Sequence, residues 1–93
     1  MDELYLYARA GCHLCDETRT ALVQFLAERA AAGLPSPTLV DREIDTNEDW
    51  QRAFMATIPV IELADRRLEL ATSPARIRQL LADVLDVPAA TRG

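Results

Sequence analysis

The stretch ARAGCHLCDETRTAL, residues 8–22, decides the fold, because a short apolar pattern gives way to a helical one inside it. It also holds both cysteines of the chain, Cys12 and Cys15, which are separated only by His13 and Leu14. Two thiols this close together can bind a metal, form a structural disulfide or act as a redox pair. Each of these roles needs different surroundings, so the rest of the chain must discriminate between them.

On either side of this stretch the pattern predicts a strand, a long helix and a second strand. Leu4–Ala8 is short and apolar on both faces, which is typical of a central strand covered on both sides. A helix follows from about Leu14 until Gly33 ends it. A strand at Thr38–Ile44 then completes a βαβ unit, which indicates a parallel pair of strands with a right-handed crossover. The helix face expected to pack on the sheet carries Leu14, Thr18, Ala21, Leu22, Phe25, Leu26 and Ala30.

The second half of the chain predicts a short helix, a strand hairpin and a last helix. The short helix is expected over residues 45–55, and a strand that opens on a proline over residues 57–63. Arg67–Leu70 is expected to pair back on that strand as a hairpin. Ser73 then caps a helix that ends near Leu85. The predicted order of elements is therefore β-α-β-α-β-β-α.

Length and composition fit one small domain. The chain has 93 residues, which is too few for two domains, and a hydrophobic fraction of 49%, which is enough to build a core. We therefore expect an α/β fold over residues 1–87, with a four-stranded mixed sheet and helices on both faces. Residues 88–93 are expected to form a flexible tail. We also expect the domain to be a monomer.

The charge balance bears on partners and on location. A net charge of −5 argues against nucleic acid and membrane surfaces as partners, because those need clustered basic side chains. The first residues lack the basic and cleavage features of a signal peptide, and no segment has the length of a membrane span. We therefore expect a cytoplasmic protein, in which a close cysteine pair is more often catalytic or metal-binding than structural.

The place of the cysteines at a helix start favours redox chemistry. Unpaired N–H groups and the positive end of the helix dipole stabilise a thiolate at Cys12, so its pKa should fall below the usual value of about 8.5. Cys15 lies one turn further on, close enough to form a disulfide with Cys12. A structural zinc ion needs four ligands, whereas the chain has two cysteines and one histidine. A metal role and an incidental pair remain alternatives at this point.

Two further features sharpen the interpretation. Arg9 stands three residues before Cys12, and the segment ATIPVI occupies residues 56–61. Together with AGCHLC at residues 10–15 and the order of elements, they resemble the thioredoxin superfamily, and within it the glutaredoxin-like family. The resemblance spans about residues 3–85. It implies a thioredoxin-like fold in which Pro59 is cis and lies against the cysteine pair.

The resemblance also implies roles for individual residues. Arg9 matches a basic position that interacts with glutathione, and the Ile58 backbone would pair with an extended thiol substrate. The sequence departs from the family at the centre of the cysteine motif, where His13 and Leu14 replace Pro-Tyr. It departs again at residues 70–71, where Leu-Ala replaces a Gly-Gly pair. The electron donor therefore stays open between glutathione and a flavoprotein reductase.

The sequence thus predicts a thiol–disulfide oxidoreductase with no bound cofactor and with glutathione as a candidate co-substrate. Cys12 would attack a disulfide in a protein or a small molecule, and Cys15 would resolve the mixed disulfide. The residues expected to contact substrate are Arg9, His13, Thr57, Ile58 and Pro59, and no metal ligand is assigned. The alternatives are a thioredoxin-fold protein that carries an iron–sulfur cluster or soft metal at Cys12, and a non-catalytic interaction module with idle thiols.

Overall fold

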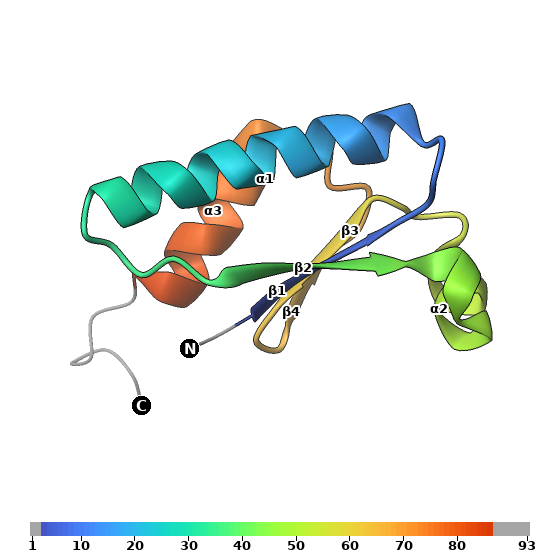
Figure 1. The fold of residues 1–93 in the computed structure, drawn as a ribbon. Coiled ribbons are helices and arrows are strands. Elements are labelled where there is room, and N and C mark those ends of the chain that lie inside the picture. Colours follow the sequence, from blue (N-terminus) through green and yellow to red (C-terminus); the bar gives the residue numbers. More distant parts are fainter. Residues whose placement is uncertain (1–2, 87–93) are drawn as a thin grey trace.

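The computed structural model describes residues 3–86, and Figure 1 shows their fold. The predicted tail at residues 88–93 lies outside the described residues. The elements are β1 (Glu3–Ala8), α1 (His13–Ala31), β2 (Thr38–Glu43), the 3-10 helix η1 (Ile44–Thr46), α2 (Glu48–Phe54), β3 (Val60–Leu63), β4 (Arg66–Leu68) and α3 (Pro74–Leu85). Apart from the added turn η1, this is the predicted order, and the predicted α/β fold class is confirmed.

The four strands form one mixed sheet in the order β2-β1-β3-β4. Strand β1 runs parallel to β2 and antiparallel to β3, and β3 runs antiparallel to β4. Helix α1 connects the parallel pair, as a crossover between parallel strands requires. In Figure 1, α1 and α3 lie together on one side of the sheet and α2 lies apart from them. The site described below lies at the end of β1 that leads into α1.

Alternate side chains of β1 enter two hydrophobic clusters. Leu4, Leu6 and Ala8 belong to the larger cluster, which includes the buried residues of α1 and α3. Tyr7 belongs to the smaller cluster, with Phe54 from α2. Successive residues of a strand point to opposite faces of a sheet, and here both faces are covered. The prediction of a central strand that is apolar on both faces is therefore confirmed.

The buried face of α1 differs from the predicted one at both ends. Leu14 is 50% exposed, and Ala30 is exposed as well. The residue that takes the buried position in the first turn is Cys15, followed by Thr18 and Leu22 at helical spacing. Because neighbouring residues on a helix point about 100° apart, a helix that buries Cys15 turns Leu14 toward solvent.

The hairpin is shorter than predicted. Strand β4 ends at Leu68, and Leu70 has a φ of 49°, a left-handed conformation that cannot continue a strand. The chain instead folds back onto the segment that precedes β3. The Leu70 N–H donates to the Thr57 carbonyl (2.9 Å), and the Ala71 N–H donates to the Pro59 carbonyl (2.8 Å). The segment before α3 is thereby tied to the proline segment.

Candidate functional site

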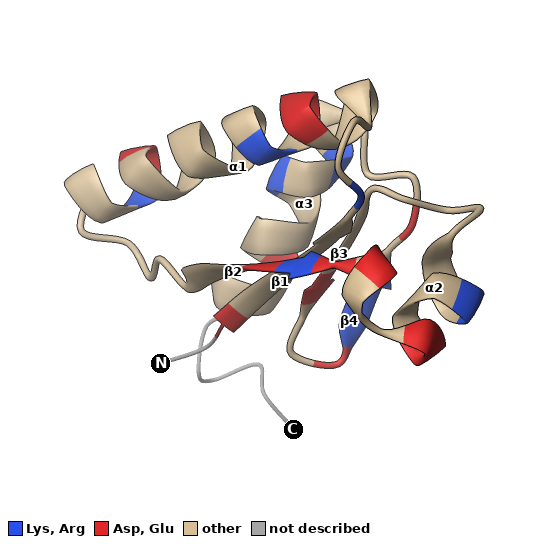
Figure 2. Ribbon diagram, turned by 45° about the vertical axis from the view of Figure 1, so that its right-hand side comes forward, with Lys and Arg blue, Asp and Glu red and all other residues tan. Residues whose placement is uncertain are grey.

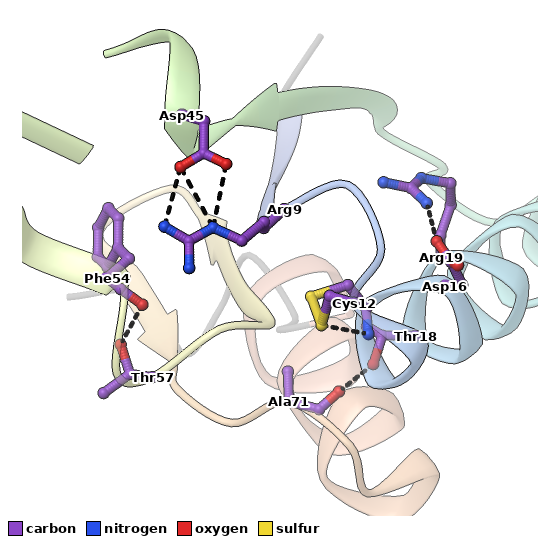
Figure 3. The surroundings of a disulfide bond; sticks show 10 residues. Arg9, Cys12, Asp16, Thr18, Arg19, Asp45, Phe54, Thr57 and Ala71 are labelled. Atoms are coloured by element: carbon purple, nitrogen blue, oxygen red, sulfur yellow. Dashed lines mark hydrogen bonds and ion pairs between the residues drawn. A yellow bond between two sulfur atoms is a disulfide. The ribbon is translucent and has the colours of Figure 1, made fainter. Parts of the chain in front are cut away.

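Cys12 and Cys15 are joined by a disulfide at the start of α1, with their Cα atoms 5.2 Å apart. The chain reaches them through a tight turn in which Gly11 has a φ of 81°, a conformation that glycine adopts at little cost. The Cys12 N–H donates to the Arg9 carbonyl across this turn at 3.1 Å. Figure 3 shows the pair between the β1–α1 loop and the helix.

The two cysteines differ in their access to solvent. Cys15 is fully buried in the larger cluster, whereas Cys12 is only partly buried. Cys12 is also the N-cap of α1, because its Sγ accepts a hydrogen bond from the Cys15 N–H at 3.1 Å. The helix dipole and this N–H both favour negative charge at that sulfur. A partner molecule can therefore reach the Cys12 sulfur more easily than the Cys15 sulfur.

The proline segment lies between the two clusters. The Ile58–Pro59 peptide bond is cis, and Pro59 is fully buried. The Ile58 side chain packs against both clusters, including the one against which Cys12 packs. The Ile58 N–H donates to the Phe54 carbonyl at 3.0 Å. This bond occupies the N–H of Ile58, and the bonds from Leu70 and Ala71 occupy the carbonyls of its two neighbours, Thr57 and Pro59.

Thr18 links the cysteine helix to the segment before α3. Its hydroxyl is buried and donates to the Ala71 carbonyl at 2.7 Å, as Figure 3 shows. Ala71 in turn donates to Pro59, so one chain of hydrogen bonds joins the helix with the disulfide, the segment before α3 and the proline segment. The helical spacing of Thr18 predicted only a core position for it. A hydroxyl within an otherwise apolar helix face is the signal that points to it.

Arg9 makes an ion pair that the sequence did not predict. Its Nη2 lies 2.9 Å from Asp45 Oδ1, and its Nε lies 3.1 Å from Asp45 Oδ2. The Asp45 carboxylate raises the pKa of Arg9, and Arg9 lowers the pKa of Asp45. In Figure 3 the Arg9 side chain extends toward η1 and away from the disulfide. The two residues are far apart in the sequence, and no motif connects them.

His13 lies on the outer surface of α1. Its side chain is 88% exposed, and its Nε2 is 3.2 Å from Glu17 Oε2, one turn along the helix. The residues predicted to bind substrate thus fall into two groups. In the proline segment, Ile58 packs against the larger cluster, as Cys12 does, whereas Arg9 and His13 are each paired with a carboxylate. Their predicted contacts with a substrate stay predictions.

Charged residues of both signs are spread over the strands and helices, as Figure 2 shows. Within residues 3–86, no three side chains of His, Cys, Asp or Glu converge in a way that could hold a metal ion. In the same part of the chain, no helix combines the length and the apolar character that a membrane crossing requires.

Comparison with known proteins finds similarity over nearly the whole described chain. The model of the Glutaredoxin-like domain (DUF836) matches residues 3–85. The chain is also similar to XcR50 of X. campestris, a structural genomics target protein, with a TM-score of 0.67 and 26% identity over 87% of this chain and 97% of that one.

Two further solved structures are similar. Protein Ne2328 from Nitrosomonas europaea has a TM-score of 0.56 and 28% identity over 73% of each chain. A malarial protein shares the fold, with a TM-score of 0.56 and 20% identity over 89% of this chain and 96% of that one. No curated protein matches the sequence.

Proposed function

The chain belongs to the Glutaredoxin-like domain (DUF836) family, and from this premise we propose that it is a thiol–disulfide oxidoreductase. The observation that carries the proposal is the bonded pair at the start of α1, in which Cys12 is partly exposed and Cys15 is fully buried. A partner molecule can reach an accessible sulfur, whereas a buried sulfur beside it can react only with that first sulfur and form the internal disulfide again. This division of access suits an attacking cysteine and a resolving cysteine.

The reaction follows the order of access. In the reduced protein the Cys12 thiolate attacks one sulfur of the partner disulfide, and the other partner sulfur leaves as a thiolate. The Cys15 thiolate then attacks the Cys12 sulfur of the mixed disulfide, which releases the second partner sulfur. Two electrons pass to the partner, and the protein ends with the Cys12–Cys15 bond. The Cys15 N–H and the start of α1 stabilise the charge on the Cys12 sulfur.

The proline segment supplies the expected docking position. Because the Ile58 N–H is already bonded to the Phe54 carbonyl, the Ile58 carbonyl is the backbone group that we propose for pairing with an extended partner. Thr57 and Pro59 support this position, since their own carbonyls hold the segment before α3 in place. The partner would be a disulfide in a protein or a small molecule, and the reaction would take place in the cytoplasm.

Single substitutions of the two cysteines test the proposal. Cys12→Ser should abolish reduction of a disulfide substrate, whereas Cys15→Ser should accumulate a mixed disulfide that mass spectrometry detects. Alkylation of Cys12 by iodoacetamide, followed against pH, should have its midpoint below the ordinary thiol value of about 8.5. Wild-type protein that reduces no disulfide with glutathione or with a flavoprotein reductase would refute the proposal. A coloured, iron-containing sample after anaerobic purification would favour the cluster-binding alternative.

A further inference from the structure

We infer that Asp45 is a specificity-determining residue that holds the Arg9 guanidinium away from Cys12, so that anionic thiols gain no electrostatic help in reaching the disulfide. The inference rests on the proposed function, and it concerns which thiols exchange with this protein. The chemical class that it disfavours is a thiol with excess negative charge, of which glutathione is the common small example. The class that it leaves unaffected is a neutral or cationic thiol.

The ion pair fixes the direction of the guanidinium. Three hydrogen bonds join Arg9 to Asp45, with donor–acceptor distances of 2.9, 3.1 and 3.2 Å. Such a two-pronged contact gives a guanidinium a defined orientation that a single bond would not. In Figure 3 this orientation is away from the disulfide. The Arg9 carbonyl, by contrast, accepts from the Cys12 N–H at 3.1 Å, so the residue itself adjoins the disulfide.

Asp45 is itself held by its neighbours. Its Oδ1 accepts a hydrogen bond from Gln51 Nε2 on α2 at 3.0 Å. Its backbone N–H donates to Glu43 Oε1 at 3.3 Å, which fixes the start of η1. These two bonds hold the Asp45 carboxylate in position independently of Arg9. Without that carboxylate, the long Arg9 side chain would keep its charge and lose the partner that directs it away from Cys12.

The other basic side chains near the start of α1 also lie beside carboxylates. His13 is paired with Glu17, and Arg19 bonds to Asp16 at 3.0 Å and to Asp41 at 2.8 Å. Glu43 stands close enough to Arg9 to raise the pKa of that side chain further. Figure 2 shows acidic residues on β2 and α2 together with a basic residue on each. The surroundings of the disulfide thus present no surplus of positive charge to an approaching anion.

The charge of the thiol that donates electrons then affects how fast it reduces the Cys12–Cys15 disulfide. Glutathione carries two carboxylates and one ammonium group at neutral pH, and ionisation of its thiol adds a further negative charge. In the exchange, two donor thiols lose two electrons and two protons and become a disulfide, and Cys12 and Cys15 take these up as two thiols. The first step brings a negative thiolate to the Cys12 sulfur, so a free cation beside that sulfur would accelerate it.

The rate at which small thiols reduce the Cys12–Cys15 disulfide tests the inference. Glutathione, 2-mercaptoethanol and cysteamine supply a negative, a neutral and a positive donor. For each thiol the rate with Asp45→Asn is divided by the wild-type rate, which cancels the intrinsic reactivity of the thiol. We expect this ratio to be roughly three- to tenfold higher for glutathione than for 2-mercaptoethanol, to be lowest for cysteamine, and to approach one as salt is added.

A matched control separates this local effect from a general loss of negative charge. Asp49→Asn likewise removes one negative charge, in this case from α2, and it frees Arg52, which forms an ion pair with Asp49 at 2.6 Å. With this control, the ratio of variant rate to wild-type rate should be similar for the three thiols. The double variant with Arg9→Gln and Asp45→Asn should lose the gain with glutathione. Asp45→Ala should reproduce the gain and provides a second test if the first variant does not fold.

The outcomes discriminate between the inference and the proposed function. Equal ratios for Asp45→Asn and Asp49→Asn would overturn the inference and leave the proposed oxidoreductase intact. A gain that survives in the double variant would also overturn it, because the gain would not come from Arg9. A wild-type disulfide that none of the three thiols reduces would overturn the proposed function and the inference together.

Discussion

Thr18 has its side chain buried in the core although it carries a hydroxyl group. That hydroxyl donates to the Ala71 carbonyl at 2.7 Å, so both polar atoms are satisfied away from water. Valine has nearly the same shape and no hydroxyl, so Thr18→Val would leave the carbonyl without its donor. We expect this change to lower the free energy of unfolding by about 1–3 kcal/mol, measured by equilibrium urea denaturation.

Thr20 on the same helix is the matched control for Thr18. Its hydroxyl donates to the Asp16 carbonyl at 3.1 Å, but it is exposed and water can replace the bond. Thr20→Val should therefore change the free energy of unfolding by no more than about 0.5 kcal/mol. Equal decreases in the free energy of unfolding of the two variants would show that the buried Thr18 hydrogen bond contributes no more to stability than the exposed Thr20 bond.

The ion pair between Arg9 and Asp45 also predicts a pH dependence of stability. Arg9 holds the pKa of Asp45 below its ordinary value in the folded protein. The ionised carboxylate therefore stabilises the fold above the unfolded pKa, which is near 4, and the contribution disappears as the pH falls through the lower folded pKa. We expect wild-type stability to fall more steeply below about pH 4 than that of Asp45→Asn.

Urea midpoints measured from about pH 6 down to about pH 2.5 would test this dependence. Arg9→Gln breaks the same pair from the other side, so it should flatten the acid limb in the same way. If the urea midpoints of the wild type and both variants fell equally steeply at low pH, the Arg9–Asp45 ion pair would not contribute to the pH dependence of stability.

The first turns of α1 provide a test of which leucines hold the helix on the sheet. Leu22 is fully buried, whereas Leu14 is 50% exposed, although the sequence pattern placed both on one face. Leu22→Ala should lower the free energy of unfolding by about 2–5 kcal/mol, because it removes core contacts and leaves a cavity. Leu14→Ala should lower it by less than about 1 kcal/mol. Chemical denaturation of both variants in the disulfide form measures the difference, and similar losses would contradict the observed rotation of the helix.

Much of the fold could be predicted from the sequence, because strands and helices have characteristic periods of apolar residues and helices begin at capping residues. Ser73 and Asn47 cap α3 and α2 by accepting from Arg76 and Trp50, as helix-start rules require. The end of β4 could not be predicted. It depends on the left-handed Leu70, whose conformation is fixed by backbone bonds to a distant segment.

The candidate site was predictable only in part for the same reason. The cysteine pair and the proline segment carry local motifs, and the structure brings both to the same core. Asp45 and Thr18 carry no motif, because each acts through a partner far away in the chain, Arg9 or Ala71. Partners of this kind follow from the packing of elements against each other and not from local sequence.

For the molecule as a whole, the two edges of the sheet bear on self-association. Strand β2 forms one edge and contains Asp41, and the short strand β4 forms the other and contains Arg66 and Arg67. Charged residues on edge strands discourage pairing with a second copy. We therefore expect sedimentation to give a monomer of 10.3 kDa in both the oxidised and the reduced state.

Removal of the charges from the β4 edge tests this expectation. The double variant Arg66→Val and Arg67→Val should self-associate with rising concentration, since it leaves an apolar, unpaired edge. Arg52→Val removes a positive charge from α2 and should remain monomeric. A wild-type dimer that persists on dilution would contradict the expected state.

The hydrogen bond from the Cys15 N–H to the Cys12 sulfur, at 3.1 Å, gives the protein an internal spectroscopic probe. A thiolate accepts a hydrogen bond more strongly than a neutral sulfur does, and the proton of the donor is deshielded accordingly. The amide resonance of Cys15 should therefore move downfield on reduction in a proton–nitrogen correlation spectrum. Its position in buffers of graded thiol-to-disulfide ratio would give the midpoint potential of the pair from one cross-peak, without a label or a coupled enzyme.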